Sequence, residues 1–301
     1  MFSLLFLFLA LSLKAQLPIA DKGKLVHHEN FPSKFIPSRT ISVWLPKDYQ
    51  LNKKYAVLYM HDGQMLFDAS ITWNQQEWGV DKAMDSLLSQ NKIRNTIVVG
   101  IWNIPQRRHQ EYFPQKPFEN LDKAEKEFVH QSLKSAGRTQ ETFQPVSDEY
   151  LKFIVTELKP FIDSNYATLT NRDNTFVAGS SMGGLISLYA LCEYPEIFGG
   201  AACLSTHWPG IFDVENNPIP KAFNHYLKKN LPKPGNHKMY FDYGTETLDA
   251  LYPPLQKEVD KILTVLGYTG NHWKTLEFKG ADHSEKAWKS RLQIPLFFIL
   301  N

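Results

Sequence analysis

Residues 179–183 have the sequence Gly-Ser-Ser-Met-Gly, which places Ser181 between two glycines. The apolar run 175–178 before it predicts a buried strand, and residues 185–191 after it predict a helix. A nucleophile elbow needs this setting, because its strained turn lifts the serine hydroxyl above the sheet and points the next N–H, that of Met182, at the same spot. The alternative is a glycine-rich turn that only connects two elements.

A serine hydroxyl is a weak nucleophile, so it needs an imidazole to take its proton and a carboxylate to orient that imidazole. In triads built on a nucleophile elbow the chain order is nucleophile, acid, histidine, and only His272 and His283 follow the region where the acid must lie. His272 begins a predicted strand and therefore lies at the wrong end of the sheet. His283 follows the same strand, and we expect it to be the base.

The loop after the predicted strand 239–244 offers the candidate acids. Asp242 still belongs to that strand and is expected to support the turn. Glu246 and Asp249 both lie in the loop, and Asp249 is next to the start of the following helix. We expect Asp249 to be the acid and keep Glu246 as the alternative.

Acyl transfer also needs two hydrogen-bond donors where the oxyanion develops. One is expected to be the Met182 amide, and the other the Gln64 amide, because Gly63 lets the backbone approach closely there. His61 and Asp62 are expected to hold this loop through hydrogen bonds, since no further metal ligands stand at a recognisable spacing. We expect neither a metal nor an organic cofactor.

Strands and helices alternate along the chain, which predicts one doubly wound, mostly parallel α/β sheet with helices on both faces. The predicted strands cover residues 39–46, 54–61, 96–102, 175–180, 198–205, 239–244 and 272–278, and the predicted helices 78–88, 185–191, 221–229, 255–266, 285–300 and one capped by Ser147.

Residues 105–146 are too long for a plain strand-to-helix connection and predict an excursion or lid over the strand ends, with a helix over 121–133. Ligands of such sheets bind beyond the carboxyl ends of the strands. Polar clusters fall at that end in residues 61–64, 179–183, 244–249 and 280–283. Their convergence favours the nucleophile elbow over the simple turn.

The composition is that of a soluble globular protein, with 43% hydrophobic and 21% charged residues in a chain of 301. A net charge of +2 excludes a dedicated nucleic-acid surface, since no basic stripe could neutralise many phosphates. Cys192 and Cys203 both lie in apolar surroundings, which favours two free thiols over a disulfide.

The apolar run 4–13 is shorter than the roughly 20 residues that a membrane-spanning helix needs. It is followed by Ala15, a small residue suited to signal-peptidase cleavage. We therefore predict a signal peptide over 1–15, a single domain over 16–301, and a secreted or periplasmic protein without a stable membrane anchor.

Several motifs together resemble the family of α/β-hydrolases named Putative esterase, which includes esterase D, enterochelin esterases, feruloyl and acetyl-xylan esterases of carbohydrate esterase family 1, and the antigen 85 mycolyltransferases. The motifs are residues 59–68 (YMHDGQMLFD), 77–81 (EWGVD), 98–101, 179–184, 241–249 and 283–288. The resemblance covers nearly the whole mature chain and implies an α/β-hydrolase fold. It also implies Ser181 as nucleophile, His283 as base, an acid after Gly244, and the amides of Gln64 and Met182 as oxyanion hole.

The substrate is less determined, and an ester of a carbohydrate or a siderophore is an expectation by analogy. Four residues just beyond strand ends are candidates for lining the substrate pocket, namely Trp102, Asn103, His207 and Trp208. Arg108, Glu111 and Tyr112 resemble a segment near the site in relatives, although a surface salt bridge would explain them equally. The leading hypothesis is a serine ester hydrolase, with an acyltransferase and a non-catalytic binding protein as alternatives.

Overall fold

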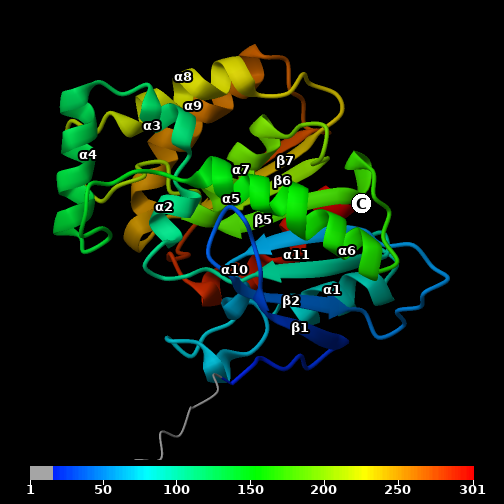
Figure 1. Ribbon diagram of the computed structural model, residues 1–301. Helices are drawn as coiled ribbons and strands as arrows, with labels where there is room; N and C mark the ends of the chain where they lie inside the picture. The colour runs from blue at the N-terminus through cyan, green and yellow to red at the C-terminus, as the bar shows by residue number, and fades with distance from the viewer. Residues whose placement is uncertain (1–15) are drawn as a thin grey trace, which may run out of the picture.

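The computed structural model describes residues 16–301 and contains one eight-stranded sheet (Figure 1). Its strands run in the spatial order β1-β2-β4-β3-β5-β6-β7-β8. The β1–β2 and β2–β4 pairs are antiparallel and all other pairs are parallel, so the predicted mostly parallel sheet is confirmed. The strands are β1 (Lys24–Phe31), β2 (Arg39–Leu45), β3 (Ala56–His61), β4 (Thr96–Ile101), β5 (Thr175–Ser180), β6 (Gly200–Leu204), β7 (Lys238–Gly244) and β8 (Trp273–Phe278).

The four central strands β3, β4, β5 and β6 are buried along their whole length, which explains why their sequences are almost continuously apolar. The edge strand β1 is mostly polar and partly exposed, and it pairs only with β2. Its sequence KLVHHENF has no clear alternation, so it was not predicted. The predicted signal peptide, residues 1–15, lies outside the described residues.

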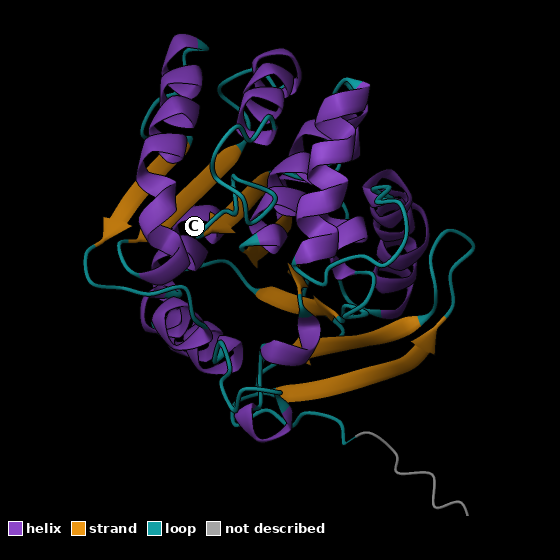
Figure 2. Ribbon diagram, turned by 90° about the vertical axis from the view of Figure 1, so that its left-hand side faces the viewer, coloured by secondary structure: helices purple, strands orange, loops and turns teal. Residues whose placement is uncertain are grey.

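Helices cover both faces of the sheet (Figure 2). One face packs against α1 (Val80–Ser89), α10 (Glu285–Arg291) and α11 (Gln293–Leu300). The other face packs against α5 (Ser147–Phe153), η3 (Ile154–Leu158), α6 (Lys159–Asn165), α7 (Met182–Glu193), α8 (Ile219–Asn230) and α9 (Tyr252–Val265). No helix within residues 16–301 combines the length and the apolar character needed to cross a membrane.

The single last helix predicted over 285–300 is wrong, because α10 and α11 are separate and meet at Leu292. Pro295 has no N–H to donate to the carbonyl of Arg291, and its ring clashes with that carbonyl in a continuous helix. The break has a structural consequence, since it lets α10 lie at the carboxyl end of the sheet while α11 runs along its face.

The excursion between β4 and α5 forms α2 (Arg108–Tyr112), α3 (Gln115–Glu119) and α4 (Lys123–Ser135). The helix predicted over 121–133 is α4, which begins and ends two residues later, whereas α2 and α3 were not predicted. Aromatic contacts join this segment to α8, with Phe113 5.7 Å from Phe223 and 5.4 Å from Phe143 between ring centroids. In Figure 1 the excursion lies beside the α8 end of the molecule. The remaining short helices are η1 (Gly63–Met65), η2 (Ala69–Ile71), η4 (Arg172–Asn174) and η5 (Thr247–Leu251).

The predicted cap of α5 differs from the structure. Ser147 is the first residue of the helix, Val146 occupies the cap position, and the Ser147 hydroxyl accepts a hydrogen bond from the Gln115 amide at 2.9 Å. The serine therefore ties the helix to the excursion. Cys192 and Cys203 are both buried free thiols, as predicted, and burial raises the pKa of each.

Candidate active site

Ser181 lies in a strained turn between β5 and α7, with φ 57° and ψ −122°. The turn is possible only with glycines, because a Cβ on Gly179 would lie 2.7 Å from the carbonyl carbon of Gly183. The Ser181 amide donates to Leu204 O at 2.9 Å, which ties the turn to the end of β6. The strand, turn and helix thus have the geometry that the sequence predicted.

His283 and Asp249 are joined by a hydrogen bond of 2.5 Å between Nδ1 and Oδ1. An ionised carboxylate can only accept, so Nδ1 carries the proton and Nε2 is free to act as a base. The imidazole is wedged edge-on between Trp288, at 5.0 Å, and Tyr252, at 5.8 Å between ring centroids. By contrast, the exposed Glu246 side chain meets only the hydroxyl of its neighbour Thr245, so the geometry favours Asp249 as the acid.

Asp249 is fully buried in η5, yet it keeps a carboxylate's acceptor role. Burial by itself would raise its pKa, but the hydrogen bonds from His283, Ser205 and Gly244 outweigh burial and hold the pKa below its usual value. The Ser205 hydroxyl and the Gly244 amide both donate to Oδ2 at 2.6 Å. The carboxylate is therefore fixed at both oxygens.

Ser181 and His283 share no hydrogen bond in the described part of the chain. Tyr252 and His207 lie between them: the Tyr252 ring packs against His283 and its hydroxyl bonds Nδ1 of His207 at 2.9 Å, while the His207 amide donates to Ser181 O at 3.2 Å. Catalytic hydrogen bonds are often long or misaligned without substrate and tighten in the reacting complex.

The oxyanion loop, residues 61–64, lies against the elbow. A Cβ on Gly183 would lie 3.5 Å from Oδ2 of Asp62, and a Cβ on Gly63 would lie 2.5 Å from the carbonyl carbon of Gly100. Among residues 16–301, neither the Gln64 N–H nor the Met182 N–H donates to another protein group. Two free backbone donors thus lie on adjacent segments beside the Ser181 turn.

Asp62 braces this loop from a left-handed backbone conformation with φ 57°. Its carboxylate accepts hydrogen bonds from Arg108, at 2.8 and 2.7 Å, and from Asn103, at 2.6 Å. Burial acts to raise the pKa of Asp62, but Arg108 outweighs it and the pKa is lowered. The Asp62 amide donates to the Tyr112 hydroxyl at 3.2 Å, so α2 holds both the side chain and the backbone of the loop.

His61, the first residue of this loop, is held by a 2.9 Å hydrogen bond between its Nδ1 and the Tyr150 hydroxyl of α5. Its burial lowers the pKa to about 3, so the imidazole is neutral. The predicted loop-holding roles of His61 and Asp62 therefore match their contacts. Glu111, from the same α2 helix, forms a two-pronged ion pair with Arg39 at 2.9 Å for each contact.

The family model described as "Putative esterase" matches residues 34–296. The chain belongs to this family. This membership identifies the chain as an esterase.

Two curated relatives are similar in sequence. The uncharacterized protein YbbA of Bacillus subtilis is 23% identical over 272 residues, covering 88% of this chain and 91% of that protein. An endo-1,4-beta-xylanase/feruloyl esterase of Xylanibacter ruminicola is 28% identical over 195 residues, which covers 61% of this chain and 21% of that protein.

Two solved structures are similar in fold. The CE1 ferulic acid esterase AmCE1/Fae1A of Anaeromyces mucronatus has a TM-score of 0.62 at 20% identity, over 94% of this chain and 93% of that one. The enterobactin esterase FES of Shigella flexneri has a TM-score of 0.63 at 16% identity, over 94% of this chain and 60% of that one. These likenesses confirm the predicted α/β-hydrolase fold of the esterase.

The four candidate substrate residues occupy different environments. Trp102 is half-buried and donates from Nε1 to the Ser42 hydroxyl at 2.9 Å. Asn103 donates to the side chains of two residues of the oxyanion loop, Asp62 and Gln64. His207 is buried beside Tyr252 and the Ser181 turn. Trp208 is buried and bonds Gln256 at 2.9 Å, a packing that does not favour the contact with substrate that we predicted for it.

Four residues next to the triad were not predicted from the sequence as part of the site: Ser205, Tyr252, Trp288 and Arg291. Trp288 belongs to a motif of the family resemblance, and Ser205 ends a predicted strand at the correct edge of the sheet. These two positions were the only signals in the sequence that we found for a role of Trp288 and Ser205 in the site. Their roles depend on side-chain contacts across the fold, which no local pattern encodes.

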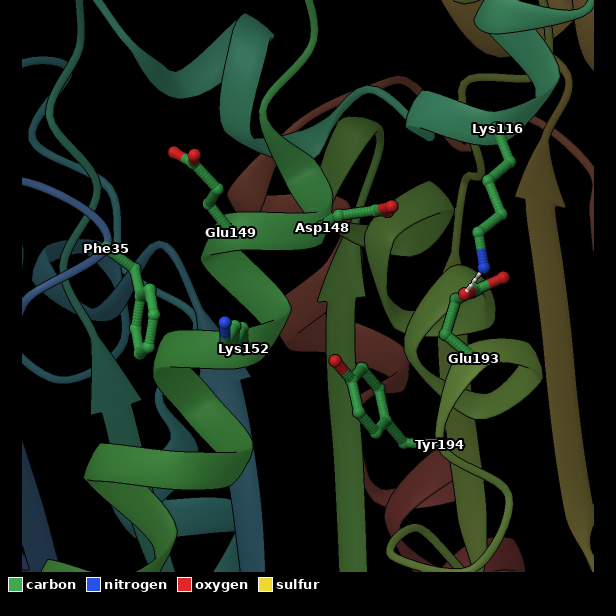
Figure 3. A pocket seen from close by; sticks show the side chains of 7 residues that line it. All are labelled: Phe35, Lys116, Asp148, Glu149, Lys152, Glu193 and Tyr194. Atoms are coloured by element: carbon green, nitrogen blue, oxygen red, sulfur yellow. Dashed lines mark hydrogen bonds and ion pairs between the residues drawn. The ribbon is translucent and has the colours of Figure 1, made fainter.

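A cleft of about 300 Å³ opens elsewhere on the esterase and contains none of the candidate catalytic residues. Figure 3 shows the ion pair of Lys116 and Glu193 at one side of this cleft, with Asp148 and Tyr194 facing it. Glu193 ends α7, whose first residue follows Ser181, so about 18 Å of helix separate the cleft from the nucleophile. The candidate chemistry therefore lies outside this cleft.

Proposed function

We propose that this esterase is a serine carboxylic ester hydrolase that works through an acyl-enzyme. Ser181 is the nucleophile, His283 the general base and Asp249 the acid that orients it. The observation that carries the proposal is the 2.5 Å His283–Asp249 hydrogen bond, formed at the same sheet edge as the strained Ser181 turn. A protein that only bound its ligand would need neither feature.

In the first half-reaction, Ser181 Oγ bonds to the ester carbonyl carbon while its proton passes to Nε2 of His283. The negative charge that develops on the carbonyl oxygen is stabilised by the N–H groups of Gln64 and Met182. Collapse of this intermediate breaks the ester C–O bond, and the leaving alcohol takes the proton from His283. Water then repeats the sequence on the acyl-enzyme and releases the carboxylic acid and Ser181.

For the substrate we propose an acylated carbohydrate or a siderophore ester. The support is similarity to a xylanase/feruloyl esterase, to a ferulic acid esterase and to an enterobactin esterase. Asn103 and His207 are the candidate substrate residues nearest the triad, and Trp102 is next to Asn103. The apolar run before Ala15 supports export of the protein to the periplasm or beyond.

The experiment is a turnover screen of the purified protein on acetylated xylan, feruloylated oligosaccharide and cyclic catecholate esters, with Ser181→Ala as the control. We expect one class to be hydrolysed with kcat/KM at least about tenfold above the others, and no turnover by the variant. The screen is repeated with added acceptor alcohols. Transfer of the acyl group to an alcohol in preference to water would replace the hydrolase with an acyltransferase.

A further inference from the structure

A group of four buried polar side chains lies beside Asp249, and one of them, Trp288, also packs against the His283 ring. We call Ser205, Asp242, Trp288 and Arg291 the Arg291 network. The Ser205 hydroxyl is at its centre, 2.9 Å from Trp288 Nε1, 2.9 Å from Arg291 Nη2 and 2.6 Å from Asp249 Oδ2. All four residues are 4% exposed or less.

The direction of the Ser205 hydroxyl follows from the chemistry of its neighbours. Trp288 Nε1 and Arg291 Nη2 can only donate, and together they occupy both lone pairs of the hydroxyl oxygen. The single Ser205 proton must therefore point at Asp249, and this hydrogen bond cannot reverse. Ser205 also holds an unusual backbone conformation, with φ 41°, which brings its hydroxyl to this place.

Arg291 brings a positive charge to the same place without neutralising Asp249. Its guanidinium pairs with Asp242 at 3.0 and 3.2 Å, while Nη2 lies 4.0 Å from Asp249 Oδ2. Burial raises the pKa of Asp242 and Arg291 opposes that effect. Asp249 Oδ2 thus accepts hydrogen bonds from neutral donors, Ser205 and Gly244, and the positive charge of Arg291 lies beyond hydrogen-bond distance, at 4.0 Å.

We propose that Ser205 and Arg291 are positioning residues for the triad, which hold the Asp249 carboxylate against His283 and set the pH at which His283 becomes a free base. The proposal rests on the proposed function for its catalytic meaning, although the contacts exist independently of it.

The sign of the effect can be worked out from the charges around the imidazole. The groups that face His283 and Asp249 are Tyr252 from α9, His207 from the loop after β6, Asp242 from β7, and Arg291 from α10; the exposed Glu246 and Asp282 lie on the flanking loops. Removing the Arg291 charge makes the electrostatic potential at the imidazole more negative, because Asp242 and Asp249 lose the cation beside them, and this favours the protonated imidazole. The titration midpoint of His283 should therefore rise, and with it the acid limb of kcat/KM.

The test is an NMR titration of His283 in the Ser181→Ala background, where no turnover occurs, with the resonance assigned by its loss in His283→Asn. In Arg291→Met and in Ser205→Ala we expect the midpoint to rise by about one pH unit. Arg291→Lys keeps the charge and should recover part of the shift. Arg39→Met is the matched control, since it breaks another buried arginine–carboxylate pair, that with Glu111, and should leave the midpoint unchanged.

A folded Arg291→Met or Ser205→Ala protein with an unmoved midpoint would overturn the proposal. Should both fail to fold, an unmoved midpoint in Arg291→Lys, which loses the second contact to Asp242 that Nε makes at 3.2 Å, would overturn it as well. The proposed function has a separate outcome. If the wild-type protein hydrolyses no ester but the midpoint moves, the role of the Arg291 network is supported and the proposed function is contradicted. If esters are hydrolysed and the midpoint does not move, the proposed function is supported and the role of the network is contradicted.

Discussion

The two sides of the site each place an arginine beside a buried aspartate, but they use the pair differently. On the oxyanion side, Arg108 donates hydrogen bonds to both carboxylate oxygens of Asp62, and the Arg108 side chain is 28% exposed. On the acid side, Arg291 is 2% exposed and grips Asp242, while Asp249 is bonded by Ser205, Gly244 and His283. The charge of Asp62 is therefore balanced directly and that of Asp249 is not.

The difference follows from what each carboxylate must do. Asp62 braces a loop whose useful groups are backbone N–H donors, so direct pairing costs nothing in function. In the reaction that we propose, Asp249 favours a positive charge on His283, and a guanidinium in direct contact would cancel that field. Neutral donors hold such a carboxylate in place and leave its charge available.

The largest effect is expected at the nucleophile, which both sides serve. Ser181→Ala should lower hydrolysis of p-nitrophenyl acetate by at least about 10³-fold, because both halves of the reaction need its oxygen. Circular dichroism and thermal unfolding should remain close to those of the wild-type protein. Substantial residual activity would remove Ser181 from the proposed role.

On the acid side, Asp249→Asn should lower kcat/KM by about 10²- to 10⁴-fold, because the amide can stabilise the wrong tautomer of His283 and carries no charge. Glu246→Gln is the matched control, and its kcat/KM should stay within about twofold of wild type. The reverse result would assign the acid role to Glu246.

On the oxyanion side, Arg108→Met should lower kcat by about 10- to 100-fold, because Asp62 loses its partner and the Gln64 N–H moves from its place. The downfield proton resonance of the His283–Asp249 hydrogen bond should persist. Arg107→Met, in the neighbouring position, removes only a partly exposed pair with Glu111 at 3.3 Å and should change kcat little. Loss of the proton resonance in Arg108→Met would show that the two sides are not independent.

Much of the fold and the elbow could be predicted because their causes are local. The apolar central strands reflect their own burial, and the glycine at 179 avoids a clash with Gly183, four residues along the chain. The acid could be narrowed to one loop by chain order, and the choice of Asp249 agrees with its contact to His283.

The Arg291 network could not be predicted, because Ser205 meets Arg291 across 86 positions of sequence and Asp249 across 44. Such contacts depend on how β6, β7 and α10 are placed in space. The orientation of α10 in turn depends on the break at Leu292, which Pro295 indicates in the sequence and which the prediction of one helix over 285–300 overlooked. The edge strand β1 was not predicted because it is partly exposed and pairs only with β2, so its sequence shows no regular alternation of apolar and polar residues.

We propose that Ser181 forms a covalent bond with substrate, assisted by His283 and Asp249. The most direct measurement is labelling with a p-nitrophenyl alkylphosphonate, followed by mass spectrometry of the proteolysed protein. We predict one phosphonyl group per chain on the peptide that contains Ser181, no label in Ser181→Ala, and labelling of Asp249→Asn slowed by at least about 10²-fold. A label on another residue, or equal labelling of Ser181→Ala, would contradict the claim.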